Sequence, residues 1–258
     1  MNVGTLFCIE ITKLKRSKII WMLLIPVIIL WLPSIFHADI NFHMEAEGIS
    51  PEHNFLIQGF MGFVWVMFPA SMVVSTVLLV QTERKNGGFT KMMSLPLSTT
   101  ELNLAKFGVL LFLAAVQMVL MSIAYFLSAY GASRLFDYSF VLSCVLVWKT
   151  AGLLYLASVP MAAFYYMISI CIHSPVFAMG AGLASIVPSV LIMNTKVWYL
   201  YPMCYPFRVL TAKMHDFAAN MGNFSYEWVP WIPVAVVFTG VCLVLSCVYF
   251  GGRERSAV

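Results

Sequence analysis

Apolar residues in this chain are gathered into six long stretches, which shorter polar segments separate. A helix needs about 20 apolar residues to cross a hydrocarbon core about 30 Å thick. Within each stretch the apolar residues are continuous and do not alternate with polar ones, which favours helices over the strands of a barrel. The pattern predicts transmembrane helices at Ile19–Phe36, Phe55–Val80, Leu104–Tyr130, Val141–Ile170, Val176–Met193 and Val229–Phe250.

Composition supports this reading and excludes a water-exposed globular domain. The 258 residues are 61% apolar and 10% charged, whereas a soluble domain has roughly 45–50% apolar and about 25% charged residues. Lipid must therefore cover much of the surface. We expect an all-α membrane protein whose single transmembrane domain covers residues 1–258. The first stretch is predicted to stay as a span, because no small-residue cleavage site follows it.

The distribution of charge predicts how the chain is oriented. Ten of the 15 Lys and Arg residues lie on the side of the spans that holds both termini. Basic residues mark the cytoplasmic side of membrane proteins, so both termini are predicted to be cytoplasmic. The net charge of +4 then reflects this sorting, and we expect no nucleic-acid partner.

Two segments flank the spans and have patterns of their own. Residues 1–18 combine apolar side chains with Glu10 and several lysines, which predicts an amphipathic elbow helix along the cytoplasmic interface. Residues 194–228 on the outer side are rich in aromatic side chains, which favour the membrane interface. We expect part of this outer segment to re-enter the outer leaflet or to form short helices that cap the bundle.

Histidines and cysteines offer candidate chemistry that the spacing does not single out. The acidic outer loop at residues 37–54 holds His37, His43 and His53, and imidazole with carboxylate can bind zinc. Their spacing matches no metal-binding pattern, so a solvated loop is the favoured interpretation. The six cysteines are scattered and are expected to be packing residues, with a Cys144–Cys204 bridge left open.

The cytoplasmic segment at residues 81–103 carries the most specific pattern. Gly87 and Gly88 interrupt the helix that leaves the second span, and Pro96 ends the short helix that follows. Ser98 or Thr99 is placed to cap the next helix. Because an exposed apolar face needs a cover, we predict that this short helix docks a partner or the membrane surface. Its predicted interface residues are Glu83, Arg84, Lys85, Phe89, Met92, Met93, Leu95 and Pro96.

Small residues in the fifth span form pairs spaced four apart, namely Gly180 with Ala184 and Ala181 with Ser185. Such pairs allow two helices to approach closely. They are predicted either to pack inside the bundle or to contact another subunit.

Motifs for catalysis and nucleotide binding do not occur in the sequence. We find no G-x-x-x-x-G-K-[ST], no H-E-x-x-H and no G-x-S-x-G. No span carries a central pair of carboxylates for ion coupling. We therefore expect no enzyme activity, cofactor or metal in this chain, and energy for any transport must come from another protein.

The second-span end and the loop after it resemble those of ABC type-2 transporter permeases. The matching residues are Glu83, Arg84, Leu95, Pro96, Leu97, Ser98 and Lys106, and the opening from Glu10 to Trp21 is similar to the elbow and first span of that family. Within it, the chain most resembles lantibiotic-immunity permeases, which expel antimicrobial peptides. The resemblance implies two permease subunits, identical or paralogous, with a cytoplasmic ATPase dimer that binds ATP.

These features predict a permease subunit of an ATP-driven exporter in a bacterial plasma membrane. Its expected substrate is an amphipathic peptide or another hydrophobic molecule. The alternative is a membrane sensor or scaffold that binds a peptide or lipid, docks a cytoplasmic partner and transports nothing. The identity of the substrate, and whether the second permease is a copy of this chain, are left open by the sequence.

Overall fold

A computed structural model gives the architecture and describes residues 3–14, 19–85, 98–220, 224 and 228–255. The described part is helical and contains no strand. Six helical segments are long and apolar enough to cross a membrane: Ile19–Phe36, Pro51–Val80, Thr99–Leu135, Cys144–Cys171, Pro175–Met193 and Trp228–Phe250. The predicted fold class and all six predicted spans are therefore confirmed, with ends that differ by a few residues.

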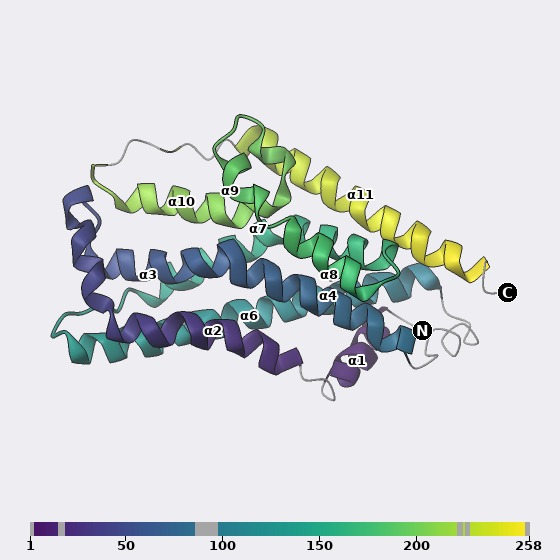
Figure 1. Cartoon of the computed structure of the whole chain (residues 1–258), viewed down its shortest axis with the longest axis horizontal. Helices are drawn as coiled ribbons and strands as arrows, with labels where there is room; N and C mark the ends of the chain where they lie inside the picture. The colour runs from purple at the N-terminus through teal and green to yellow at the C-terminus, as the bar shows by residue number, and fades with distance from the viewer. Residues whose placement is uncertain (1–2, 15–18, 86–97, 221–223, 225–227, 256–258) are drawn as a thin grey trace.

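The long helices run along one axis, and both ends of the described chain lie at the same end of the bundle (Figure 1). We call this the terminal end, and the other the distal end. The helices are α1 (Val3–Leu14), α2 (Ile19–Phe36), α3 (Pro51–Gly62), α4 (Phe68–Lys85), α6 (Thr99–Leu135), α7 (Cys144–Cys171), α8 (Pro175–Ala184), α9 (Pro188–Met193), α10 (Tyr205–Phe217) and α11 (Trp228–Arg255). Short helical segments are η1 (Ala38–Glu47), η2 (Phe63–Met67), η3 (Trp198–Leu200) and η4 (Pro202–Cys204).

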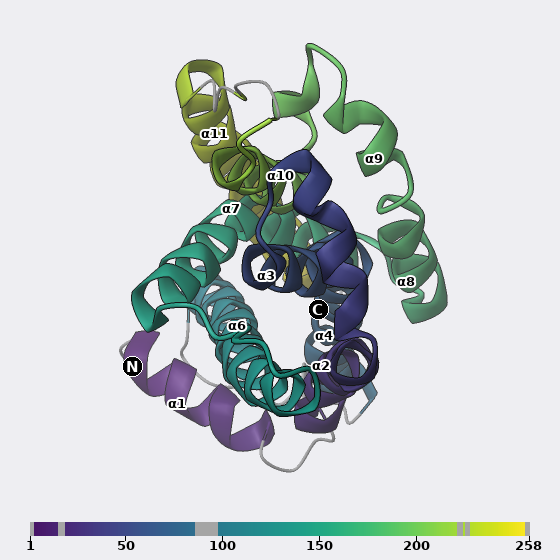
Figure 2. The same ribbon diagram turned by 90° about the vertical axis from the view of Figure 1, so that its left-hand side faces the viewer.

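Aromatic side chains form the core where α2, α3 and α6 meet. The indole ring of Trp31 lies 5.5 Å from the ring of Phe55 and 5.6 Å from that of Tyr125, centroid to centroid. All three side chains are buried, and such pairs add to the stabilisation from burial alone. In the view along the bundle, α8, α9 and α11 lie at the periphery (Figure 2). Their apolar outer surfaces are suited to lipid.

Prolines explain two irregular places in the spans. Pro69 has no N–H to donate to the carbonyl four residues earlier, and the π-helical segment η2 directly precedes the helix that contains it. Pro188 begins α9, and α8 ends at Ala184, four residues before it. In this break the Tyr201 hydroxyl donates a 2.5 Å hydrogen bond to the Ser185 carbonyl. The predicted fifth span, Val176–Met193, is therefore present but is divided into two helices at this break.

The distal end is more ordered than the predicted solvated loop. Residues 38–47 form the 3-10 helix η1, and Ala38 and Ile49 are fully buried. The Asn54 side chain donates a 3.0 Å hydrogen bond to Asn41. This buried amide pair fixes η1 on α3, so the segment packs as part of the protein.

Candidate coupling site at the terminal end

The structure places the helices that flank the predicted coupling segment at the terminal end. Helix α4 ends there at Lys85 and α6 begins there at Thr99, beside α1 (Figure 1). Ser98 caps α6, since its hydroxyl accepts a hydrogen bond of 3.3 Å from the backbone N–H of Glu101. This confirms Ser98, one of the two predicted cap residues, as the cap of the helix that forms the third span.

Most of the predicted interface residues cannot be placed. Glu83, Arg84 and Lys85 lie in the last turn of α4. The remaining residues, Phe89, Met92, Met93, Leu95 and Pro96, lie outside the described residues. Their role in binding an ATPase therefore stays a prediction.

Helix α1 packs against α6. The rings of Phe7 and Phe112 meet edge to face with 6.2 Å between centroids. Gly108 lies beside this contact, and a Cβ atom there would make an ordinary contact of 3.5 Å with the Phe7 ring. Leu6 is buried in the same contact region of the core. Helix α1 thus buries part of its apolar surface on protein, and its place at the membrane interface stays a prediction.

A buried ion pair connects these two helices. The Lys106 ammonium lies 3.9 Å from one carboxylate oxygen of Glu10, and the two side chains are 2% and 6% exposed. The Lys13 ammonium lies 2.5 Å from the other oxygen and is 38% exposed. Among the residues whose exposure is described, Glu10 and Lys106 are the only buried charged ones. A buried charge is costly unless it is compensated, so this pair holds α1 and α6 in one arrangement.

Sequence reasoning singled out both residues and missed that they pair. Glu10 marked the amphipathic opening, and Lys106 matched the family pattern after the loop. The spacing of residues in α1 could have indicated a buried charge. Leu6 and Glu10 are four residues apart and therefore share a face of the helix. That face is the one buried on α6. A charged residue on the buried face of a helix requires a partner.

Hydrogen bonds extend from the same end into the other helices. The Tyr166 hydroxyl on α7 donates to the Asn103 side-chain oxygen on α6 at 2.7 Å. The Asn103 amide in turn lies 3.2 Å from the Cys247 sulfur on α11. Ser169 on α7 donates to the Thr76 hydroxyl on α4 at 3.0 Å. A displacement at the terminal ends of α4 and α6 would therefore act directly on α7 and α11.

Predicted small-residue contacts in the fifth span divide into two sets. Ala178 and Gly182 face inward, and a Cβ on Gly182 would lie 2.7 Å from the Val73 side chain. Gly180, Ala181 and Ala184 are exposed and Ser185 is partly exposed. The inner packing is thus made by Ala178 and Gly182, and contact of the exposed set with a second subunit stays a prediction.

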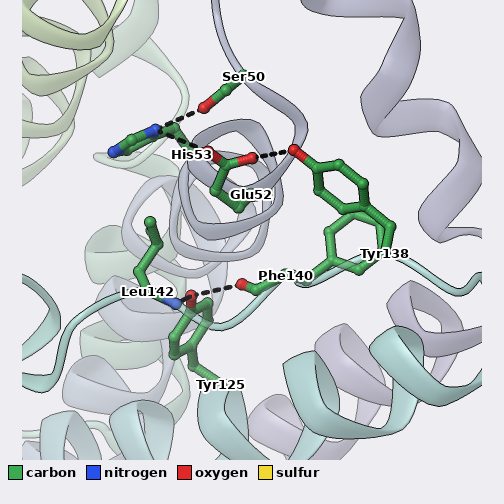
Figure 3. Close-up of polar contacts among 7 residues, drawn as sticks. All are labelled: Ser50, Glu52, His53, Tyr125, Tyr138, Phe140 and Leu142. Atoms are coloured by element: carbon green, nitrogen blue, oxygen red, sulfur yellow. Dashed lines mark hydrogen bonds and ion pairs between the residues drawn. The ribbon is translucent and has the colours of Figure 1, made fainter.

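Polar contacts at the distal end fix the loop between α6 and α7 (Figure 3). The Tyr138 hydroxyl donates a 2.5 Å hydrogen bond to Glu52 on α3, and the Tyr125 hydroxyl donates to the Phe140 carbonyl at 3.0 Å. His53 Nδ1 lies 2.6 Å from the Ser50 hydroxyl, with its ring 4.3 Å from that of Phe217. In the described ranges, no three His, Cys, Asp or Glu side chains gather as a metal site would require.

In residues 194–220 the aromatic segment forms short helices, and the longest of them packs on the bundle. Helix α10 contacts α3 and α7, and the rings of Phe207 and Trp65 lie 6.2 Å apart. The Arg208 guanidinium lies 4.1 Å from the Trp198 ring centroid and 4.6 Å from that of Phe224. It also donates to the Met193 carbonyl at 3.1 Å. This arginine fixes the segment after α9 to α10.

All six cysteines are free, including the two of the possible Cys144–Cys204 bridge. Cys144 is exposed and Cys204 is buried, with its thiol 3.1 Å from the Ser189 carbonyl. Burial raises the pKa of the Cys204 thiol to about 12, an effect that the nearby Arg208 charge reduces only in part. Cys204 is thus a packing residue.

Comparison with known proteins agrees with this architecture. The family model described as ABC-2 family transporter protein matches residues 6–188, which is well over half of the chain. The chain therefore belongs to the ABC-2 transporter family, and it is a membrane-spanning permease subunit of an ABC transporter. Searches of curated proteins and of solved structures found no match.

Proposed function

We propose that this chain is the permease subunit of an ATP-driven exporter in a bacterial plasma membrane, with the terminal end in the cytoplasm. Residues 81–103 dock a cytoplasmic ATPase dimer, which binds the ATP. A second permease, identical or paralogous, completes the membrane part. The substrate is an amphipathic or hydrophobic molecule, and an antimicrobial peptide is the favoured one because of the resemblance to lantibiotic-immunity permeases.

The observation that carries this proposal is the Glu10–Lys106 ion pair. It fastens the elbow to α6 within eight residues of the Ser98 cap, where the coupling segment rejoins the bundle. Helix α6 has 37 residues, which corresponds to a length of about 55 Å. A push on its terminal end would therefore displace the elbow and the distal end together.

The polar groups inside the bundle favour a transporter that takes its energy from another protein. They are mostly hydroxyls and amides that pair with one another, such as Ser71 with Gln117 at 2.7 Å and Ser169 with Thr76 at 3.0 Å. The buried charges in the described part lie at the terminal end. Proton or sodium coupling uses ionisable side chains within the membrane, and the interior of the described bundle offers hydroxyls in their place.

In the proposed cycle, closure of the ATPases moves the coupling segment, and α4 and α6 transmit that movement to the spans. Phe89 and Met92 are assigned to the buried contact with the ATPase. Loss of one such anchor typically costs about 1–3 kcal/mol of partner affinity. Glu83 is assigned to bracing the segment through an ion pair.

The test is reconstitution of the chain with its ATPase in vesicles, with ATP-dependent uptake of an amphipathic cationic peptide into inside-out vesicles as the readout. Phe89→Asp is expected to abolish uptake and to lower the amount of ATPase that co-purifies, and Phe89→Leu to retain both. Insertion into the membrane should be equal for all three proteins. Equal uptake by Phe89→Asp and the natural chain would refute the proposed coupling contact. ATPase binding without transport of any substrate would favour the sensor or scaffold.

A further inference from the structure

A cavity opens on the side of the bundle between α7, α10 and α11. It encloses about 750 Å³, a volume typical of sites for small molecules. Its walls are apolar over most of their area, with Leu156 and Pro160 on α7, Val209 on α10, and Ile232 and Val236 on α11. None of these lining residues belongs to α1, α4 or α6, the helices that carry the ion pair and flank the predicted coupling segment.

The opening of the cavity faces the surroundings of the transmembrane helices. Leu156, Ile232 and Val236 line it and are 65%, 48% and 66% exposed. Both α7 and α11 belong to segments that are apolar and long enough to span a membrane. A molecule that enters the cavity from the side would therefore come from the hydrocarbon region of the bilayer.

Charge is confined to one end of the cavity. Among the described residues that line it, Lys149 on α7 and Lys213 on α10 are the charged ones, and none of these described residues is acidic. Lys213 also bonds Asp216 at 3.0 Å, so Lys149 contributes the less compensated charge. Trp228 lies in the first turn of α11 and stacks on Trp231 with 5.6 Å between ring centroids. Tryptophan and lysine are typical of the headgroup level of a membrane.

The residues that line the cavity change in character along α7 and α11. From Lys149 to Pro160 on α7, and from Trp228 to Thr239 on α11, the lining changes from charged or aromatic to mainly aliphatic. Eleven residues of helix rise by about 16 Å. The site is thus cationic at the distal headgroup level and apolar toward the middle of the membrane. That gradient matches the chemistry of a lipid with a negative headgroup.

We propose that this cavity binds an anionic phospholipid from the leaflet at the distal end. The phosphate lies between Lys149 and Lys213, and an acyl chain extends along Leu156, Pro160 and Val236. The lipid fills the space between α7 and α11 that the protein leaves open. This site is independent of the substrate and of the ATPase contact.

The experiment exposes the full chain, purified in detergent, to vesicles of equal parts phosphatidylglycerol and phosphatidylcholine. Mass spectrometry then counts the lipids that remain bound after repurification. The natural chain is expected to retain more phosphatidylglycerol than phosphatidylcholine. A lysine near the membrane surface contributes an attraction to anionic lipid of about fivefold in affinity. Lys149→Gln should therefore lower the preference about fivefold, and Lys213→Gln by less because Asp216 already compensates it.

Two further variants separate this site from general surface attraction. Lys196→Gln removes an exposed lysine that does not line the cavity, and it should keep the natural preference. Ala235→Trp fills the cavity and should reduce the retention of both lipids. Equal retention of the two lipids by the natural chain would overturn the proposal, as would a preference that survives in the Lys149→Gln, Lys213→Gln double variant. A second copy of the chain covering Leu156 and Val236, detected by cross-linking between copies, would also overturn it.

Discussion

Removing the charges of Glu10 and Lys106 one at a time and together should show a strong coupling between them. Their charged groups are 3.9 Å apart with side chains 6% and 2% exposed. Unit charges at 4 Å attract by about 4 kcal/mol in an environment like that of a protein surface layer, against about 1 kcal/mol in water. Desolvation offsets part of this attraction. We expect a coupling energy of about 2 kcal/mol for the pair, in the range of residues in direct contact.

The assay is a double-mutant cycle with Glu10→Gln and Lys106→Gln, read as the free energy of unfolding in mixed micelles with increasing SDS. Lys13 is present in all four proteins, so its bond to Glu10 does not enter the coupling with Lys106. The matched control is the Lys213–Asp216 pair, whose atoms are closer at 3.0 Å but whose Asp216 side chain is 43% exposed. Exposed pairs couple by about 0.2–1 kcal/mol.

Burial of the two charges is therefore predicted to affect the coupling energy more than the distance between them. The reasoning is refuted if the Glu10–Lys106 coupling is no larger than that of Lys213 and Asp216, because the elbow would then be held by apolar contacts alone. A large loss of stability in each single variant without coupling would lead to the same conclusion.

Two other predictions follow from local packing. A Cβ at Gly59 would overlap the ring of Trp31, whereas one at Gly152 has nothing within 4 Å. Gly59→Ala should therefore lower the free energy of unfolding by about 1–3 kcal/mol, while Gly152→Ala should leave it equal or raise it. The pKa of the buried Cys204 thiol is raised to about 12, so its thiolate is scarce at pH 8. A variant in which Cys204 is the one remaining cysteine should therefore resist maleimide at that pH, and a variant that keeps only the exposed Cys144 should react. Rapid labelling of Cys204 in the folded protein, or equal effects of the two glycine changes, would contradict these assignments.

The spans could be predicted from sequence because lipid imposes a simple rule on composition. Continuous apolar runs such as Ile19–Phe36 were recognisable without any tertiary information, and this span has the same bounds in the structure. The start of α6 was predictable too, since Ser98 followed by Glu101 is a local capping signal. Signals that act within one turn of helix can be read directly from the chain.

Contacts between distant residues could not be predicted in the same way. Tyr138 bonds Glu52 across 86 residues of sequence, and nothing near either residue specifies the other. The break between α8 and α9 was also missed, because Pro188 inside a span is compatible with a kinked helix as well as with two helices. Tyr201 supports the broken form by donating to the Ser185 carbonyl, and that contact depends on how the outer segment folds back.

The account rests most directly on the place where the ATPase docks. A photoreactive amino acid replacing Met92 should cross-link to the ATPase in the assembled transporter. The same amino acid at Leu135, which is exposed at the distal end of α6, should not. Cross-links to the ATPase from position 135, or their absence from position 92 in a transporter that hydrolyses ATP, would contradict the account.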